Sequence, residues 1–412
     1  MTGSALYFVF VQNHTALTIT NNYSVEILFI THKYPPSVGG MEKQSFELTQ
    51  RMKQHAVVHL LCCAAGESKL RFFWQLKNSI REQLRRHPGI SMLHFNDGLA
   101  AAFCSGADDF PGILRTVTLH GLDVVYPNRF YQRVLLPRIG RFHAIIAVSQ
   151  ATAAACIERG IDPQKIQVIP NGVDHDLAHY VPTPEAQQQF QRDYQLDFRG
   201  KRTLILMGRP VLRKGFSWFL GNVFPLLPAD FQLLIIGPFR RERPFSAVLL
   251  QGLPAALRKQ VELLFGLPSD EDALRLLLRA PAAQGRVRHL GKLPLPDIMQ
   301  IMSAATAFLM PNIAVEGDME GFGLVCLEAN LRGLPVIAAR LEGITDAVQQ
   351  EKNGWLLPAQ DVATWVETLA GLGQEPASTT AFGQQARQYA LDHFGWEKMT
   401  AEYYAHFEKM HR

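Results

Sequence analysis

Two glutamates eight positions apart, Glu320 and Glu328, stand in the stretch of this sequence that is best suited to binding chemistry. The apolar run 306–310 before them predicts a strand, and 324–331 predicts a helix. Glycines at this junction allow a ligand to approach the backbone, and the first amides of a helix offer unpaired N–H groups with a partial positive charge. A phosphate would fit there, with one acid before the helix and the other on its second turn. The segment therefore suits a ligand with an anionic middle and hydroxyl-rich ends, the shape of a nucleotide sugar.

A second glycine-containing junction, Gly39-Gly40, follows the predicted strand 27–31 and precedes the predicted helix 41–53. Paired glycines at such a turn let backbone N–H groups meet a phosphate. The alternative is an ordinary turn between a strand and a helix. The glycine spacing matches neither the dinucleotide fingerprint nor the P-loop.

Three further polar residues directly follow predicted strands. His120 comes after 114–119, where an imidazole can donate to a substrate hydroxyl or transfer a proton. Arg209 and Lys214 follow 203–207, and their planar fork and point charge both suit a diphosphate. The alternatives are a histidine that caps a turn and two solvated basic residues.

Two charged clusters leave alternatives open. The acidic residues Glu316, Asp318 and Glu320 are dense enough for a divalent cation, but the spacing of a calcium loop is absent from the sequence, so no metal site is assigned. The basic amphipathic segment 70–87 predicts either a helix packed on a sheet or a helix on an anionic membrane. For the membrane alternative we expect Leu70, Phe73, Trp74, Ile80 and Leu84 on one side of that helix.

Bulk composition describes a globular chain of several domains. Its 412 residues are 47% hydrophobic and 19% charged, which allows sizeable cores. The net charge of +4 gives no reason to expect nucleic-acid binding. The five cysteines lack the spacing of a zinc site, so free thiols in a reducing cytosol are expected. Residues 1–24 are expected to be an extension without a function of its own.

Strand-like and helix-like segments alternate along the chain, which is typical of doubly wound parallel sheets. Six strands are predicted before the pause at 170–174, and six after the polar stretch 182–202. The predicted strands lie near residues 27–31, 57–62, 92–95, 114–119, 144–148, 167–169, 203–207, 232–236, 286–290, 307–310, 335–338 and 355–357. Because open α/β sheets bind ligands beyond the C-terminal ends of their strands, two such lobes imply a cleft that suits a two-substrate reaction.

Taken together and in this order, the motifs resemble those of the family-4 glycosyltransferases, over residues 25–412. The resemblance implies the GT-B fold, with two Rossmann-like lobes that face a cleft and a C-terminal helix that crosses back to the first lobe. The implied division is an acceptor lobe at 25–195, a donor lobe at 196–385 and a helical segment at 386–412 that packs on the first lobe.

The resemblance also implies roles for the first-lobe residues and for the basic pair. Gly39 and Gly40 match the loop that approaches the donor diphosphate. His120 matches the histidine that contacts the donor sugar. Arg209 and Lys214 match the basic pair that stabilises the leaving nucleoside diphosphate. With Glu320, these three side chains form the expected catalytic set.

For the E-x7-E motif, the resemblance implies that Glu320 holds the hydroxyls of the transferred sugar and that Glu328 takes those of the ribose. The stretch 289–293, including Leu290 and Leu293, matches the strand end that cradles the base. The backbone of the loop between the two acids would meet the phosphates, through Gly321, Phe322, Gly323, Leu324 and Val325. Two departures from the family pattern are Pro210 in the phosphate loop and an insertion-like segment at 314–319.

The implied reaction moves a hexosyl unit from a nucleoside-diphosphate sugar to an acceptor hydroxyl with retention of configuration, without a metal cofactor. The implied acceptor is a saccharide or glycolipid in the assembly of cell-surface polysaccharide or lipopolysaccharide. The implied location is the cytoplasm, at the inner face of the membrane if segment 70–87 binds lipid. The alternatives are a nucleotide-sugar epimerase or a sugar phosphorylase on the same fold, and a non-catalytic partner subunit.

Overall fold

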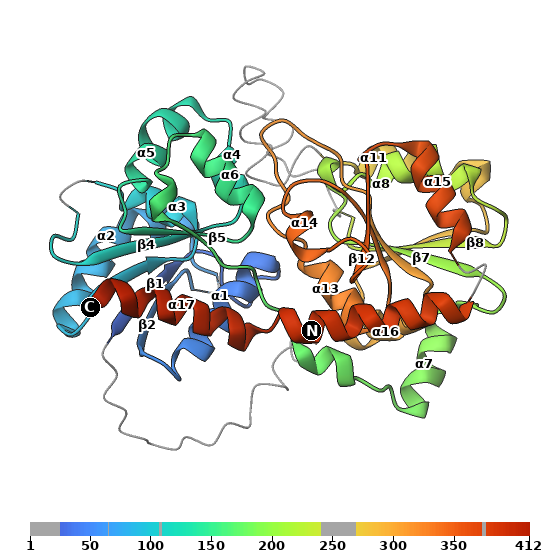
Figure 1. The fold of residues 1–412 in the computed structure, drawn as a ribbon, viewed down its shortest axis with the longest axis horizontal. Coiled ribbons are helices and arrows are strands. Elements are labelled where there is room, and N and C mark those ends of the chain that lie inside the picture. The colour runs from blue at the N-terminus through green and yellow to red at the C-terminus, as the bar shows by residue number, and fades with distance from the viewer. Residues whose placement is uncertain (1–24, 65, 107–108, 240–268, 373–375) are drawn as a thin grey trace.

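The computed structural model describes residues 25–64, 66–106, 109–239, 269–372 and 376–412 (Figure 1). The extension expected at 1–24 lies outside these residues. In Figure 1 the described chain forms two lobes side by side, each built around one sheet. The expected two-lobed α/β fold is confirmed.

The first lobe holds a six-stranded parallel sheet in the order β2-β1-β3-β4-β5-β6. The strands are β1 (Glu26–Thr31), β2 (Val57–Cys62), β3 (Met92–Phe95), β4 (Leu114–Leu119), β5 (Ala144–Ala147) and β6 (Ile166–Val168). Its helices are α1 (Gly40–Met52), α2 (Lys69–Arg86), α3 (Gly98–Phe103), α4 (Leu122–Val125), α5 (Leu136–Ile139) and α6 (Gln150–Glu158).

The second lobe holds another six-stranded parallel sheet, in the order β12-β11-β10-β7-β8-β9. The strands are β7 (Arg202–Met207), β8 (Phe231–Ile236), β9 (Val287–Gly291), β10 (Ala307–Met310), β11 (Val336–Ala339) and β12 (Gly354–Leu357). The helices after the first lobe are α7 (Pro184–Tyr194), α8 (Phe216–Trp218), α11 (Glu271–Leu277), α12 (Leu295–Ala304), α13 (Leu324–Leu331), α14 (Ile344–Ala347), α15 (Val362–Gly371), α16 (Pro376–His393) and α17 (Trp396–His411). Helix α7 occupies part of the polar stretch 182–202, which the sequence pattern leaves without an element.

Strand order places the loops that matter for function. In each sheet the order reverses once, between β1 and β3 in the first lobe and between β7 and β10 in the second. Loops at such a reversal diverge to opposite faces of the sheet and leave a crevice at the C-terminal ends of the strands. Gly39-Gly40 follows β1, Lys214 follows β7 and Glu320 follows β10. The topology therefore directs the candidate residues to the two crevices.

Two segments of the chain cross between the lobes, and they do so side by side. Residues after β6 run beside the break between α16 and α17, where Val173 and Gly395 form a parallel bridge. A Cβ at Gly172 would lie 2.5 Å from the backbone nitrogen of Trp396, so only glycine fits this crossing. Helices α16 and α17 follow one another along both lobes (Figure 1). The boundary predicted at residue 386 falls inside α16, which packs on α13 of the second lobe.

Helix α17 packs on the first lobe, as expected for the crossing helix. Its buried face repeats every three to four residues through Trp396, Met399, Tyr403 and Phe407, which is the period of an α-helix. These side chains share a core with strand β1 and helix α1. The Tyr403 hydroxyl lies 2.9 Å from the Thr118 hydroxyl and accepts a hydrogen bond from Gln44 Nε2 at 3.3 Å.

Helix α2 shows that one part of the sequence interpretation was wrong. The residues that face the sheet are Phe72, Leu76 and Ile80, whereas Leu70 and Trp74 are 84% and 89% exposed. The helix therefore packs an apolar stripe on the sheet and also carries two large apolar side chains in solvent. None of the helices within the described residues combines the length and apolar character that a membrane crossing requires.

We predict that Tyr403→Phe destabilises the fold by about 1–3 kcal/mol, because it leaves buried Gln44 and Thr118 without a shared hydrogen-bond partner. The measurement is the midpoint of thermal unfolding, and the matched control is Tyr404→Phe at the half-buried neighbouring tyrosine. Equal midpoints for Tyr403→Phe and wild type would contradict the proposed role of this hydroxyl.

Candidate active site

Glu320 is held between two cations at the end of β10. Its Oε2 lies 2.8 Å from Lys214 Nζ and 3.5 Å from an Arg213 guanidinium nitrogen, and it accepts a hydrogen bond from Asn312 Nδ2 at 3.3 Å. Lys214 and Arg213 come from the loop after β7, the neighbour of β10 in the sheet. Two loops that are about a hundred residues apart in sequence thus build one charged centre.

The two cations decide the protonation of Glu320. Burial alone raises the pKa of a carboxyl group, but the charges of Lys214 and Arg213 outweigh it and lower the pKa of Glu320 to about 2. Nearby Glu342 behaves in the opposite way: burial raises its pKa to about 7, and the neighbouring Glu320 carboxylate adds to this. A Glu342 oxygen accepts a hydrogen bond from the Glu320 backbone N–H at 2.6 Å.

Arg213 and Asp318 belong to this centre although the sequence analysis assigned neither a role. The Arg213 Nε atom lies 3.6 Å from Asp318 Oδ1. Burial disfavours the guanidinium charge, but Glu320 and Asp318 outweigh that cost and raise the pKa of Arg213. Two of the three acids weighed as a metal site, Asp318 and Glu320, are therefore paired with basic side chains. A buried arginine beside a motif acid carries no signal in a single sequence.

The N-terminal ends of two helices meet here, one from each lobe. Helix α1 begins after Gly39 and helix α13 begins after Gly323, and within the described residues no side chain caps either start. A Cβ at Gly40 would lie 3.4 Å from the side chain of Leu324, so the two first turns are neighbours. Unpaired N–H groups and both helix dipoles therefore favour an anion between them.

Gly321 and Gly323 allow this approach for different reasons. A Cβ at Gly321 would lie 2.0 Å from the His120 carbonyl oxygen, so a side chain at 321 would push the lobes apart. Gly323 has a φ of 95°, a backbone conformation that other residues rarely adopt. Phe322 is buried and reaches toward Phe394 with a ring distance of 6.1 Å.

His120 lies opposite Gly321 at the end of β4. Its Nε2 is 2.8 Å from the Asn96 carbonyl oxygen and must donate to it, because a carbonyl only accepts. When Nε2 carries the only ring proton, Nδ1 is an acceptor. The backbone N–H of His120 donates to Asp123 Oδ1 at 2.8 Å. Burial raises the pKa of Asp123, although the neighbouring His120 opposes the shift.

Glu328, the second motif acid, pairs across the lobes with a residue that the sequence analysis missed. Lys43 Nζ of helix α1 lies 3.2 Å from Glu328 Oε1 of helix α13. Both side chains are partly buried. This ion pair and the α1–α13 contact hold the two glycine-containing junctions against each other.

Arg209 is separated from the Lys214 centre. Its exposed guanidinium forms no ion pair within the described part of the chain, and it lines a pocket of about 180 Å³ with Pro210, Phe239 and Glu271. Pro210 is buried, and its carbonyl accepts from the Asp270 N–H at 2.9 Å. Pro210, the residue that departs from the family pattern, thus anchors this loop to the start of α11.

An aromatic stack that the sequence analysis did not predict lies beside this pocket. The rings of Phe239 and His289 are 3.8 Å apart at 25°, and the Arg275 guanidinium carbon lies 4.1 Å from the Phe239 ring centre. His289 Nε2 donates to the Gly237 carbonyl at 2.7 Å. At the end of β9, Leu290 is half-buried against the core and the Leu293 side chain is in the core, so Leu293 can offer a ligand only its backbone.

The insertion-like segment 314–319 packs against the first lobe. Met319 is buried in the core of that lobe, and a Cβ at Gly317 would lie 2.8 Å from Pro127. The segment therefore forms part of the contact between the lobes.

We predict that Glu342→Gln stabilises the protein at pH 8 by on the order of 1–2 kcal/mol. Because its folded pKa of about 7 lies above its ordinary value of 4.5, Glu342 favours folding below that ordinary value. This contribution is lost as the pH rises through 7, and glutamine avoids the cost of the charge while it still accepts from the Glu320 N–H.

The measurement is the free energy of unfolding across the pH range, where variant and wild type should converge in acid. Glu367→Gln, an exchange at an exposed glutamate, is the matched control. A difference that stays constant with pH would contradict this reading of Glu342.

Comparison with known proteins finds glycosyltransferases. A family model described as glycosyl transferases group 1 matches residues 187–389, and one described as Glycosyltransferase Family 4 matches residues 38–177. A D-inositol 3-phosphate glycosyltransferase of Corynebacterium efficiens is 30% identical over 236 residues, which cover 57% of this chain and 49% of that protein. A GDP-mannose-dependent phosphatidylinositol monomannoside mannosyltransferase of Mycolicibacterium smegmatis is 26% identical over 280 residues, 67% of this chain and 65% of that protein.

A crystal structure of HepE from Anabaena in complex with UDP-glucose shares the fold, with a TM-score of 0.70 and 19% identity over 93% of this chain and 99% of that one. The chain spans about half to two thirds of the length of the curated relatives described above. The two family models fall on the two lobes, in the order that the motifs predict. The chain therefore belongs to the glycosyltransferases, in the family that these two models describe, and its fold is GT-B.

Proposed function

We propose that the protein is a retaining glycosyltransferase that moves a hexosyl unit from a nucleoside-diphosphate sugar to an acceptor hydroxyl. The observation that carries this proposal is the convergence of the predicted residues from separate stretches of sequence. Gly40 and His120 of the first lobe lie against Leu324 and Gly321 of the second, beside the Lys214–Glu320 pair.

The donor diphosphate would bind between the starts of α1 and α13. The two helix ends supply unpaired N–H groups of the 39–40 and 321–325 junctions. Lys214 is paired with Glu320 at 2.8 Å, and a diphosphate would share its charge. Arg209, which lacks such a partner within the described residues, would add a planar fork from the pocket side. These groups supply the positive charge, so we propose that the reaction needs no metal cofactor.

The transferred sugar would lie between His120 and Glu320. The low pKa of Glu320, about 2, keeps it ionised, and an ionised carboxylate accepts hydrogen bonds from sugar hydroxyls. The hydrogen bond of His120 to the Asn96 carbonyl uses Nε2, which leaves Nδ1 as the atom for a ligand. It can accept from another hydroxyl and help to orient the ring.

The nucleoside would extend toward β9. Glu328 would take the ribose hydroxyls, which requires its ion pair with Lys43 to open or to be shared. The backbone at Leu290 and Leu293 would border the base, beside the Phe239–His289 stack. The pocket next to Arg209 lies beyond the ends of β7 and β8, and Phe239 of the stack lines it.

The chemistry would rest on stabilising the leaving diphosphate. As the glycosidic bond breaks, negative charge would grow on the phosphate oxygens, where Lys214, Arg209 and the helix amides would stabilise it. The acceptor hydroxyl would attack from the face that the diphosphate leaves and pass its proton to the departing phosphate. No protein nucleophile is then required.

The acceptor is proposed to be a saccharide or glycolipid of a cell-surface polymer, in line with the relatives that act on inositol phosphate and phosphatidylinositol mannoside. Helix α2 supports contact with the inner face of a membrane. Its exposed Leu70 and Trp74 lie near Arg71, while Lys77 pairs with Asp109 at 2.9 Å. An amphipathic surface with basic residues is attracted to anionic lipid.

We predict that Lys214→Ala lowers turnover by about 10²–10³-fold, since it removes a charge aimed at the leaving group. The fold should persist because Arg213 still pairs with Glu320. The measurement is transfer from UDP-, GDP- and ADP-sugars, after a thermal-shift screen has found the nucleotide that stabilises the wild type.

The control is Lys398→Ala at an exposed lysine of α17. Product analysis with and without inorganic phosphate distinguishes a transferase from a phosphorylase. Near-normal transfer by folded Lys214→Ala protein would exclude the proposed role of this lysine.

We predict that the double variant Leu70→Ser and Trp74→Ser releases the protein from vesicles with anionic lipid. The measurement is co-sedimentation, with neutral vesicles as a second arm, and binding should weaken as salt rises. The matched control is Leu276→Ser, at a leucine that is 71% exposed in the second lobe. Equal sedimentation of double variant and wild type would rule out α2 as the contact.

A further inference from the structure

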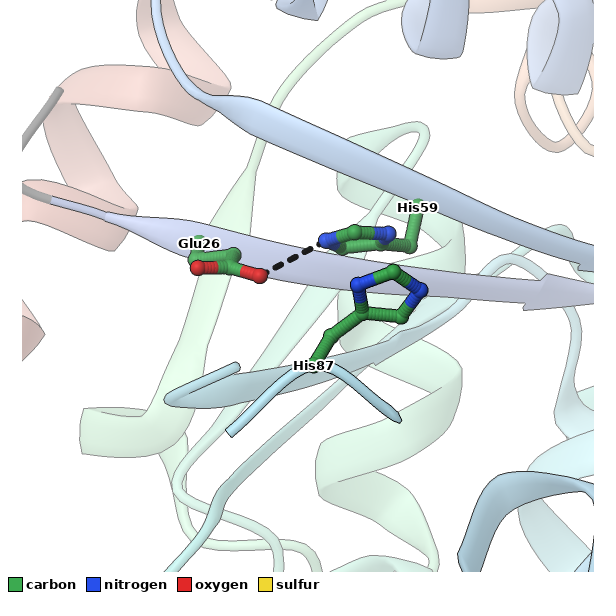
Figure 2. A group of neighbouring side chains, drawn as sticks. All are labelled: Glu26, His59 and His87. Carbon is green, nitrogen blue, oxygen red and sulfur yellow. Dashed lines mark hydrogen bonds and ion pairs between the residues drawn. The ribbon is translucent and has the colours of Figure 1, made fainter. Parts of the chain in front are cut away.

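Two histidines and a glutamate meet near the N-terminal ends of strands β1 and β2, at the end of the first sheet opposite the proposed donor site. Figure 2 shows Glu26 and His59 on neighbouring strands and His87 reaching toward them from the segment after α2. One ligand atom from each lies within 4.8 Å of the others, and the three are half-buried. Among the described residues this is the one group of three or more such side chains with that spacing.

The fold brings these residues together from three separate segments. Glu26 is the first residue of β1, and His59 pairs in register with Leu28, two residues further along β1. Because side chains alternate along strands, Glu26, Leu28 and His59 point to the same face. Helix α2 covers that face through Phe72, Leu76 and Ile80 and ends beside the cluster, with His87 as its C-cap.

The carboxylate and the loop are held in place before any ion binds. Glu26 Oε1 lies 2.7 Å from His59 Nε2, and the His59 and His87 rings are 4.0 Å apart between centres. The Ser91 N–H donates to the Glu26 carbonyl oxygen at 3.1 Å, which ties the loop after α2 to β1. A Cβ at Gly89 would lie 2.1 Å from Glu26 Oε2, so the loop leaves room for the carboxylate.

We propose that Glu26, His59 and His87 bind a zinc ion. Two imidazole nitrogens and one carboxylate oxygen are the ligand set that Zn²⁺ prefers, whereas Ca²⁺ and Mg²⁺ require more oxygen ligands. Ligands at about 2.0–2.1 Å around a tetrahedral ion lie roughly 3.3 Å apart. The Glu26–His59 separation is 2.7 Å and no other separation exceeds 4.8 Å, so small rotations of the side chains would complete the site, with water as a fourth ligand.

The ring of His87 supports a ligand role. It lies against His59 with the two rings tilted by 33°, and neither of its ring nitrogens has a hydrogen-bond partner in the part of the chain that the structure describes. The ion would replace the Glu26–His59 hydrogen bond and join β1, β2 and the end of α2. Strand β2 is at the edge of the sheet, and the side chains of Glu26 and His59 are 24% and 17% exposed, so an ion can enter from solvent.

This site is independent of the proposed transfer reaction. It lies at the N-terminal ends of the strands, whereas His120 and the 39–40 junction follow the C-terminal ends. The six residues of β1 separate the two ends of the strand by roughly 16 Å. The proposed ion therefore stabilises the first lobe without a part in transfer.

The test is zinc binding to untagged protein, measured by competition with a chromophoric chelator and by thermal shift. We expect one zinc per chain and a rise of a few degrees in the unfolding midpoint, reversed by a chelator. Because loss of an outer partner of a metal site costs 10–100-fold in affinity, loss of a ligand in His87→Gln or Glu26→Gln should cost at least about tenfold. Substitution of Co²⁺ should give the visible absorption of a tetrahedral site.

Two further variants separate this site from other zinc ligands. Gly89→Ala keeps all three ligand residues but displaces the Glu26 carboxylate, so it should weaken binding while the chain still folds. His411→Gln, at an exposed histidine, and Cys62→Ser, at the end of β2, should bind zinc as the wild type does. Failure of the wild type to bind zinc, unchanged binding in folded His87→Gln, or loss of binding in Cys62→Ser would each overturn the proposal.

Discussion

The burial of one carboxylate at the contact between the lobes is the constraint on which the rest of the site depends. Glu320 can stay ionised there only because Lys214 and Arg213 approach it, and their charges lower its pKa to about 2. Arg213 in turn pairs with Asp318, and burial, with the Glu320 charge adding to it, raises the pKa of Glu342. Removal of one charged side chain from this group would leave its partner as an unpaired buried charge and would destabilise the fold. The cluster therefore fixes the loops after β7 and β10 relative to each other.

A second constraint is the space between the lobes. The His120 carbonyl oxygen faces Gly321 so closely that no side chain fits between them, and Gly40 lies against Leu324. These contacts bring the starts of α1 and α13 together with their dipoles directed at one place. Lys43 and Glu328 add an ion pair across the same contact. The glycines matter here because the backbones themselves make the contact.

The relation between the lobes is also set at a distance from the site. The chain crosses at Gly172 and again at Gly395, and α17 then buries Trp396 and Tyr403 in the first lobe. Helix α16 on the second lobe and helix α17 on the first are thus joined by a short break. The arrangement allows the second lobe to be positioned by the packing of α17 as well as by the charged cluster.

Local pattern alone determined the strands, the helix 324–331, the lobe order and the polar residues that follow strands β4, β7 and β10. Buried parallel strands read as apolar runs, and their C-terminal ends collect ligand-binding groups whatever the details of packing. The same pattern grouped Leu70 and Trp74 with the buried residues of α2, whereas both are exposed. A helix with apolar residues on more than one side does not show from sequence which of these sides packs on the sheet.

Tertiary structure decided which charges are paired. Arg213, Glu342 and Lys43 take their partners from loops or helices that are far away in sequence, and a pKa depends on such neighbours and on burial. The Glu26–His59–His87 group also depends on residues that are far apart in sequence. The register of β1 and β2 and the end of α2 bring them together, and no spacing in the sequence predicts this.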